Sequence, residues 1–194
     1  RAAFSWITKK LMGQVNIPII TSNRINTPQV GEEVLATGCA DMVSMARPML
    51  ADAHFVSKAM NGKADQIAPC IACNQACLDH TFGGKISSCL VNPRACYETE
   101  LTLPDAAIKK TIAIVGAGPA GLSTAIAATE RGHKVTIFDK SGEIGGQLNM
   151  AKQVPGKEEF WGLVDWYRTM VAELKIETKL GKTVSSQDLG DFDE

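Results

Sequence analysis

Ile112-Ala-Ile-Val-Gly-Ala-Gly-Pro-Ala-Gly121 is the stretch that decides the fold of the second half of this chain. An apolar run typical of a strand leads into a G-x-G-x-x-G pattern, and the alanine-rich segment 122–131 predicts a helix. The next apolar run, Val135-Thr-Ile-Phe138, ends at Asp139. G-x-G-x-x-G alone is a weak signal. Between a strand and a helix, with an acid about 20 residues further on, it predicts a βαβ unit that binds a dinucleotide.

Each glycine of this pattern has its own expected role. Gly116 permits a tight turn, Gly118 lets the backbone approach a pyrophosphate, and Gly121 lets helix and strand pack closely. Backbone amides near Ala120, at the N-terminus of the helix, are expected to face the diphosphate. Asp139 is expected to accept hydrogen bonds from the adenosine ribose.

A second glycine pair lies in Glu143-Ile-Gly-Gly-Gln147, soon after this acid. A nicotinamide domain does not need such a pair, whereas a flavoprotein that extends past the ADP moiety often has one. We therefore interpret the dinucleotide as FAD, with Gly146 and Gln147 as further contacts and Val184 placed to meet the adenine through its backbone. Residues 160–174 predict a helix, and residues 176–180 alternate like a strand.

Upstream, the spacing C-x2-C-x3-C-x11-C places four of the six cysteines close together in the sequence. A 4Fe-4S cluster needs one thiolate per iron, so a tight turn can supply three ligands while a separate segment supplies the fourth. We interpret this pattern as an iron–sulfur site. Its expected ligands are Cys70, Cys73, Cys77 and Cys89.

Two other interpretations of the cysteines remain open. A four-cysteine zinc site usually takes two ligands from each of two C-x2-C knuckles, and Cys89 has no partner at that spacing. Disulfides require an oxidising compartment, and no secretory signal is recognisable. We expect Cys39 and Cys96 to be small buried hydrophobic residues rather than ligands.

Residues 17–62 read as two successive βα units of a parallel α/β fold. The runs 17–21 and 41–45 predict short strands buried on both faces. A helix is expected from Thr27-Pro28 to a cap at Gly38. The second helix, with Phe55, Val56 and Met60 on its apolar face, is expected to end at Asn61-Gly62.

An arginine follows each predicted strand end, where functional groups gather in parallel α/β folds. The last two βα loops of a (β/α)8 barrel often bind a phosphate. Arg24 and Arg47 are therefore candidates for clamping a phosphorylated cofactor such as FMN, with backbone amides near Ala46 as further donors. Taken alone, loop arginines are just as often solvent-facing or paired with acids.

Composition narrows the class of protein. A net charge of −1 and a pI near 6.4 over 194 residues, with no basic run, argue against nucleic-acid binding. The apolar stretches are too short to span a bilayer, so we expect a cytoplasmic protein without membrane contact. The chain starts at Arg1, in what reads as the middle of an amphipathic helix, and we expect it to be a piece of a longer protein.

Five motifs in this order resemble the bacterial 2,4-dienoyl-CoA reductase (NADPH) family, old-yellow-enzyme-like iron–sulfur flavoproteins. The motifs are Ile-Thr-Ser-Asn-Arg-Ile, Val-Ser-Met-Ala-Arg-Pro, Cys-Ile-Ala-Cys-Asn-Gln-Ala-Cys, Cys-Leu-Val-Asn-Pro and Val-Gly-Ala-Gly-Pro-Ala-Gly-Leu. The resemblance covers essentially the whole chain. It implies an α/β protein with the C-terminal part of an FMN-binding (β/α)8 TIM barrel (1–64), an iron–sulfur loop (65–97), a linker (98–110) and an incomplete Rossmann-like FAD-binding domain (111–194).

The resemblance also implies a reaction of fatty acid β-oxidation. NADPH gives hydride to FAD, electrons pass singly through the cluster to FMN, and FMN reduces the unsaturated acyl-CoA. Carried over by position, the FMN contacts are Arg24, Ala46 and Arg47, the cluster ligands are the four cysteines, and the FAD contacts are Ala120, Asp139, Gln147, Lys157 and Val184.

In that family the catalytic Tyr and His precede the part matched by this chain, so no catalytic residue is assigned here. One alternative is a related enoate reductase or a trimethylamine-dehydrogenase-like oxidoreductase, although for the latter we expect x2 rather than x3 between the second and third cysteine. An alternative of another class is a zinc-stabilised nucleotide-binding module.

Overall fold

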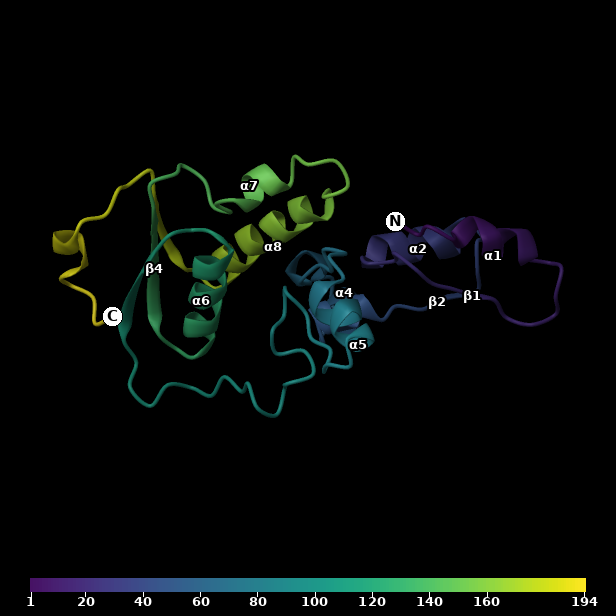
Figure 1. Cartoon of the computed structure of the whole chain (residues 1–194), viewed down its shortest axis with the longest axis horizontal. Coiled ribbons are helices and arrows are strands. Elements are labelled where there is room, and N and C mark those ends of the chain that lie inside the picture. The colour runs from purple at the N-terminus through teal and green to yellow at the C-terminus, as the bar shows by residue number, and fades with distance from the viewer. The chain divides into compact units, whose positions relative to one another are not determined.

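The computed structural model describes all 194 residues and divides into two compact units, Arg1–Glu98 and Thr99–Glu194 (Figure 1). We call them unit 1 and unit 2 and describe each by itself. No helix in either unit combines the length and the apolar character needed to cross a membrane.

Unit 1 is built from short elements joined by long loops. Its two strands, β1 (Ile20–Thr21) and β2 (Met42–Val43), are parallel, with Ile20 opposite Met42 and Thr21 opposite Val43. The α-helices are α1 (Ser5–Leu11), α2 (Pro28–Ala36), α3 (Arg47–Ala51), α4 (Phe55–Met60) and α5 (His80–Phe82), with a 3-10 turn η1 (Ala64–Gln66) and a π-helical turn η2 (Gln75–Asp79).

Helix α2 has the ends that its sequence predicts. The Thr27 hydroxyl accepts a hydrogen bond from the Val30 amide at 3.3 Å, and Pro28 occupies the first turn, where its missing N–H costs nothing. At the other end Gly38 adopts φ +64°, and its amide donates to the Leu35 carbonyl at 3.0 Å. Gly38 therefore closes the helix one residue beyond the cap residue Thr37.

The expectation that both strands of unit 1 are buried on both faces is wrong. Each strand is two residues long, and Ile17, Ile20 and Met42 are 70%, 55% and 47% exposed. A complete (β/α)8 barrel covers every strand with two neighbouring strands and a ring of helices, whereas β1 and β2 pair only with each other. The apolar residues of the two strands are therefore left partly exposed, because no further strand or helix covers them within unit 1.

The apolar face expected for the second helix is likewise only partly buried. Phe55 is 2% exposed and packs in the core, but Val56 and Met60 are 52% and 82% exposed. A separate short helix, α3, precedes α4, because Asp52 adopts an extended conformation between them.

Unit 2 has the predicted βαβ order, extended by a third strand (Figure 1). Strands β3 (Thr111–Val115), β4 (Lys134–Asp139) and β5 (Glu177–Leu180) are parallel and lie in the order β3-β4-β5. The helices are α6 (Pro119–Glu130), α7 (Leu148–Ala151) and α8 (Glu159–Glu173), followed by a 3-10 turn η3 (Ser186–Leu189).

Strand β4 is the centre of the unit 2 core. Residues 135–138 are all buried, as expected of a strand with a neighbour on each side and cover on both faces. Leu122 of α6 and Val164 of α8 are fully buried, and the Ser123 and Tyr167 hydroxyls join these two helices at 2.8 Å. The helix predicted for residues 160–174 and the strand predicted for residues 176–180 are confirmed as α8 and β5.

The chain returns to the free edge of β3 at its end. The Asp193 amide donates to the Thr111 carbonyl at 2.9 Å, and the Ala113 amide donates to the Glu194 carbonyl at the same distance. The residues after β5 therefore pass to the far side of β3, although they form no further strand of the sheet. In open parallel sheets ligands bind in the crevice at the carboxyl ends of the strands.

Candidate functional site

The glycine-rich loop lies at the carboxyl end of β3, between β3 and α6. Gly116 has φ +117° and its amide donates to the Phe138 carbonyl of β4 at 2.7 Å. A Cβ at Gly121 would lie 1.9 Å from the Gly116 carbonyl oxygen, so no side chain fits there. A Cβ at Gly118 would meet nothing within 4 Å. The loop is therefore tight against the protein at Gly121 and open at Gly118, where a ligand can approach the backbone.

The N-terminus of α6 offers amide donors to this open side. Gly118 is the cap residue and no side chain caps the helix, while Pro119 fills the first turn. Ala120 is exposed beside it. Because the first amides of a helix have no partner within the helix, this end suits a phosphate group.

Asp139 at the end of β4 is tied to the loop by hydrogen bonds. One carboxylate oxygen accepts the Ala117 amide at 2.6 Å, and the other accepts the Ser141 amide at 2.7 Å. Each carboxylate oxygen can accept a second hydrogen bond, so Asp139 keeps the capacity to bind ribose hydroxyls. Its first effect, however, is to hold the glycine-rich loop against β4, a role that the sequence did not reveal.

The second glycine pair packs directly on the first glycine-rich loop. The Gly145 amide donates to the Ala117 carbonyl at 2.7 Å, and a Cβ at Gly146 would lie 2.9 Å from the Gly118 Cα. Gln147 follows as the exposed N-cap residue of α7. The structure therefore brings Asp139 and Gly146 to the loop that contains Gly118, although they follow it by more than 20 residues in the sequence.

Two predicted FAD contacts are not joined to this loop. Lys157 is exposed in the segment between α7 and α8, where its amide donates to the Val154 carbonyl at 3.0 Å. Val184 is half-buried between β5 and η3. Neither residue makes a hydrogen bond to the glycine-rich loop.

In unit 1 the four predicted cluster ligands line one pocket, which we call the cysteine pocket. Each of the four cysteines is half-buried, and Arg47, Leu50, Asn74 and Leu90 contribute to the same lining. Of the other two cysteines, Cys39 is buried as expected. The expectation for Cys96 is wrong, because it is exposed in a turn with φ +65°.

A metal ion and an iron–sulfur cluster place different demands on the cysteine sulfurs. No three His, Cys, Asp or Glu side chains anywhere in the chain are close enough together to bind one metal ion. A zinc ion requires its sulfur ligands within about 2.3 Å of the metal, whereas an iron–sulfur cluster takes thiolates from cysteines placed around a larger core. Four cysteines around one pocket are the kind of donor set from which either centre takes its ligands.

Burial raises the pKa of the Cys70 and Cys89 thiols above the usual cysteine value. Backbone amides partly offset this effect, from Ala72 at Cys70 and from Asn92 and Val91 at Cys89. Mutual repulsion with the other thiols of the pocket raises the pKa further. The protein alone thus disfavours the thiolate forms of Cys70 and Cys89, and binding a metal centre would release their protons.

The x3 gap between Cys73 and Cys77 is accommodated by a π-helical turn. The Asp79 amide donates to the Asn74 carbonyl, five residues back, at 3.0 Å. A π turn contains one residue more than an α turn and is frequent at functional sites. Asn74 starts this turn in the left-handed region, with φ +63°.

The two arginines predicted from separate strand ends line the same pocket, which we call the arginine pocket. Its lining consists of Arg24, Ile25, Asn26, Arg47, Pro48, Cys70 and Ala72. Arg24 follows β1 with φ +57°, and Arg47 is the first residue of α3, directly after the exposed cap residue Ala46. Arg47 and Cys70 line both this pocket and the cysteine pocket.

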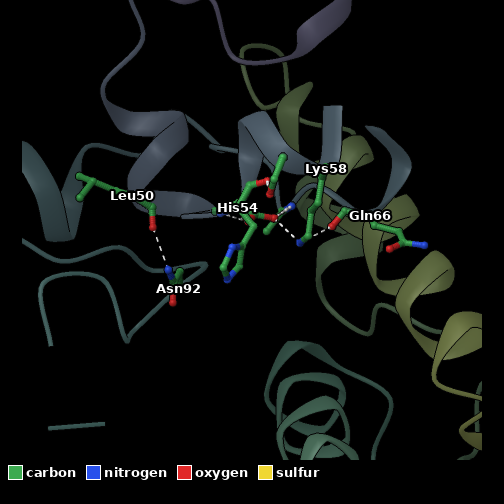
Figure 2. A network of polar contacts seen from close by, with 8 residues as sticks. Leu50, His54, Lys58, Gln66 and Asn92 are labelled. Atoms are coloured by element: carbon green, nitrogen blue, oxygen red, sulfur yellow. Dashed lines mark hydrogen bonds and ion pairs between the residues drawn. The ribbon is translucent and has the colours of Figure 1, made fainter. Parts of the chain in front are cut away.

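A network around Asp52, which the sequence did not reveal, fixes the start of the cysteine segment (Figure 2). Asp52 is 6% exposed, and its carboxylate accepts the Lys58 ammonium at 2.6 Å and the Ala68 amide at 2.9 Å. The second carboxylate oxygen accepts the His54 amide, and Lys58 also donates to the Gln66 carbonyl, both at 2.9 Å. The backbone two residues before Cys70 is thereby tied to α4.

A second tie holds the segment after the fourth cysteine (Figure 2). The Asn92 side-chain amide donates to the Leu50 carbonyl of α3 at 2.9 Å. Separately, the Asn26 side-chain amide donates to the Cys70 backbone carbonyl at 3.3 Å. In the sequence, Asp52 is recognisable only as an aspartate just after a helix, and Asn92 only as an asparagine before proline. Neither pattern indicates the distant residue that it contacts.

Comparison with known families divides the chain as the two units do. Residues 1–66 match the family described as NADH:flavin oxidoreductase / NADH oxidase. Residues 114–170 match the NAD(P)-binding Rossmann-like domain.

Among curated proteins, a metal reductase of Desulforamulus reducens is 44% identical over 181 residues, which cover 91% of this chain and 27% of that protein. A cinnamate reductase of Clostridium sporogenes is 35% identical over 194 residues, covering 97% of this chain and 28% of the relative. The chain thus spans little more than a quarter of these relatives.

Among solved structures, 2-naphthoyl-CoA reductase in complex with 2-naphthoyl-CoA superposes with a TM-score of 0.93 at 32% identity, over 96% of this chain and 29% of that protein. Histamine dehydrogenase from Rhizobium sp. 4-9 superposes with a TM-score of 0.87 at 26% identity, over 96% of this chain and 28% of that protein.

Proposed function

We propose that this chain, which joins the end of an NADH:flavin oxidoreductase TIM-barrel domain to a Rossmann-like NAD(P)-binding domain, is the electron-relay part of an iron–sulfur flavoprotein reductase. One observation carries the proposal. The four cysteines line a single pocket whose wall includes Arg47, and Arg47 also lines the pocket that contains Arg24. The two pockets share Arg47 and Cys70, which supports a cluster in the cysteine pocket beside a flavin phosphate in the arginine pocket.

The cluster would supply one-electron transfer, while the flavins supply the conversion between hydride and single electrons. The chain's own residues would hold these groups. Cys70, Cys73, Cys77 and Cys89 would ligate the cluster, and Arg24 and Arg47 would bind the FMN phosphate, with Ala46 at the start of α3.

In unit 2 the open backbone at Gly118 and the α6 N-terminus would receive the FAD diphosphate. Asp139 would bind the ribose while keeping the loop in place. Gly146 and Gln147 would extend the contact beyond the ADP moiety, toward the flavin.

For the whole protein we propose NADPH as the electron donor and an unsaturated acyl-CoA, of the 2,4-dienoyl class, as the acceptor. The likeness to a reductase whose structure contains 2-naphthoyl-CoA supports a CoA thioester, and the likeness to a cinnamate reductase supports reduction of a conjugated double bond. Amine oxidation is the second candidate, favoured by the likeness to histamine dehydrogenase and to an N,N-dimethylglycine/sarcosine dehydrogenase.

An assay of the whole protein that contains this chain separates these candidates. Anaerobic NADPH oxidation should depend on 2,4-dienoyl-CoA and should be faster with it than with cinnamate. Oxidation of dimethylglycine or histamine with an artificial electron acceptor, without any reduction of enoyl substrates, would instead establish the amine-oxidising alternative.

The relay itself is tested with Cys77→Ser in the same protein. The variant should lose NADPH-dependent reduction but retain reduction when dithionite supplies electrons directly to the FMN site. Equal loss with both donors would show that Cys77 supports the fold rather than the electron path.

A further inference from the structure

We propose that Asn74 is a positioning residue that holds the Arg47 guanidinium between the cysteine pocket and the arginine pocket, so that one cation acts on both the cluster and the flavin phosphate. This inference rests on the function proposed above. It adds a residue outside both predicted ligand sets and gives Arg47 a second task, which is to raise the reduction potential of the cluster.

The geometry that carries the inference lies entirely within unit 1. The Arg47 Nη1 donates to the Asn74 Oδ1 at 2.5 Å, across 27 positions of sequence. Asn74 stands between Cys73 and Cys77 and lines the cysteine pocket with them. Arg47 lines that pocket and also the pocket that contains Arg24. The hydrogen bond therefore fixes the guanidinium at the wall that the two pockets share.

The residue type at position 74 meets two requirements at once. Its backbone has φ +63° and ψ −4°, a left-handed conformation that asparagine and glycine adopt more readily than other residues. Its side-chain oxygen accepts the hydrogen bond from Arg47 without adding charge beside the thiols. Glycine would satisfy only the first requirement, and aspartate would provide the acceptor but also a negative charge.

Electrostatics gives the direction of the effect. A cluster with four thiolate ligands becomes more negative when it accepts an electron, so a nearby cation stabilises the reduced form more than the oxidised form. The pocket is half-buried, which weakens solvent screening.

The shared position also couples the two cofactors. A flavin phosphate bound in the arginine pocket would neutralise part of the Arg47 charge and lower the potential of the cluster. Because such coupling is reciprocal, reduction of the cluster should weaken phosphate binding by the same factor. The reduction potential of the cluster would then depend on whether FMN is bound.

Potentiometric titration of the cluster, followed by visible absorbance and electron paramagnetic resonance, tests the inference in the whole protein. Asn74→Gly preserves the backbone and removes the acceptor, so the reduced-to-oxidised ratio at a fixed potential should fall about tenfold, equivalent to about 59 mV for one electron. Asn74→Asp should lower the potential further, because its carboxylate opposes the Arg47 charge. Removing FMN should raise the potential of the unmodified protein and have less effect in Asn74→Gly.

Asn61→Asp is the matched control, because it adds the same charge at an exposed position that lines neither pocket. Iron and sulfide contents are measured for every variant. A full cluster whose potential shifts no more in Asn74→Gly and Asn74→Asp than in Asn61→Asp would overturn the inference. Loss of the cluster from Asn74→Asp leaves Asn74→Gly as the deciding variant. Absence of iron and sulfide from the unmodified protein would instead contradict the proposed function itself.

Discussion

Units 1 and 2 form their sites by opposite means. Unit 2 presents backbone, because its glycine-rich loop is held against β4 by Asp139 and leaves Gly118 open to a ligand. Unit 1 presents side chains, with four cysteines around one pocket and a buried Asp52 network holding the loop that carries them. A backbone site depends on the close packing of its sheet, and a side-chain site depends on polar contacts between distant segments.

The two units also differ in how far they bury their strands. Strand β4 is buried along residues 135–138, whereas Ile20 and Met42 of the unit 1 strands are about half exposed. Both units have buried apolar residues, such as Phe55 in unit 1 and Val164 in unit 2, but only unit 2 buries most of a strand. This contrast predicts that the units respond differently to substitution and to loss of a metal centre.

The largest effect is expected in the cysteine pocket. Cys77→Ser should abolish the broad visible absorbance of the cluster, because a 4Fe-4S cluster needs one thiolate per iron. Cys96→Ser is the control, since Cys96 is exposed and outside the pocket. A full cluster spectrum in Cys77→Ser would refute the ligand assignment.

In unit 2 the corresponding test is Gly121→Ala. The new Cβ would lie 1.9 Å from the Gly116 carbonyl oxygen, so we expect a loss of about 3 kcal/mol of stability and loss of FAD binding. Gly142→Ala should change little, because a Cβ there meets nothing within 4 Å. Denaturation followed by the fluorescence of Trp161 and Trp166 reports on unit 2. Equal stability of the two variants would show that the loop is not packed as described.

A moderate effect is expected for Asp52→Ala. The change leaves the Lys58 ammonium and the Ala68 amide without their shared acceptor, and we expect a cost of about 2–3 kcal/mol after allowing for the partial exposure of Lys58. Hydrogen exchange in unit 1 should rise near Ala68 while unit 2 stays protected. Asp65→Ala, at an exposed position, is the control. Unchanged exchange at Ala68 would mean that the network does not hold the loop.

The smallest effect is expected for Tyr167→Phe. It removes the 2.8 Å hydrogen bond with Ser123 and should cost about 1 kcal/mol. Burial raises the pKa of Tyr167 above its ordinary value of 10.0. The folded state therefore holds the phenol proton more tightly than the unfolded state, and stability should fall as pH rises above about 10. This alkaline loss should be weaker in the variant, and an identical pH profile would contradict the assignment.

The same contrast explains what the sequence predicted and what it did not. The order β3-α6-β4 and the positions of its glycines followed from one local pattern, because the contacts of that loop are set by neighbouring elements. The hydrogen bonds of Asp52 to Ala68 and of Arg47 to Asn74 join positions 16 and 27 residues apart, and no periodicity indicates such pairs.

Strand burial in unit 1 was misjudged for a related reason. An apolar run such as that at residues 17–21 indicates that a strand needs cover on both faces, but it does not indicate which segment supplies that cover. The burial of Cys96 was also predicted wrongly, because the residue type alone does not show whether a cysteine lies in an exposed turn or in the core. The spacing of Cys70, Cys73, Cys77 and Cys89 was more informative, because the structure brings all four to one pocket, and their role as ligands stays a prediction.

The most direct test of the central claim is the metal content of the cysteine pocket. Protein containing this chain, purified without oxygen, is analysed for iron, acid-labile sulfide and zinc, alongside Cys77→Ser. Our account predicts iron and sulfide in equal amounts in the unmodified protein, both strongly reduced in the variant. Zinc at one ion per chain, without iron or sulfide, would contradict it.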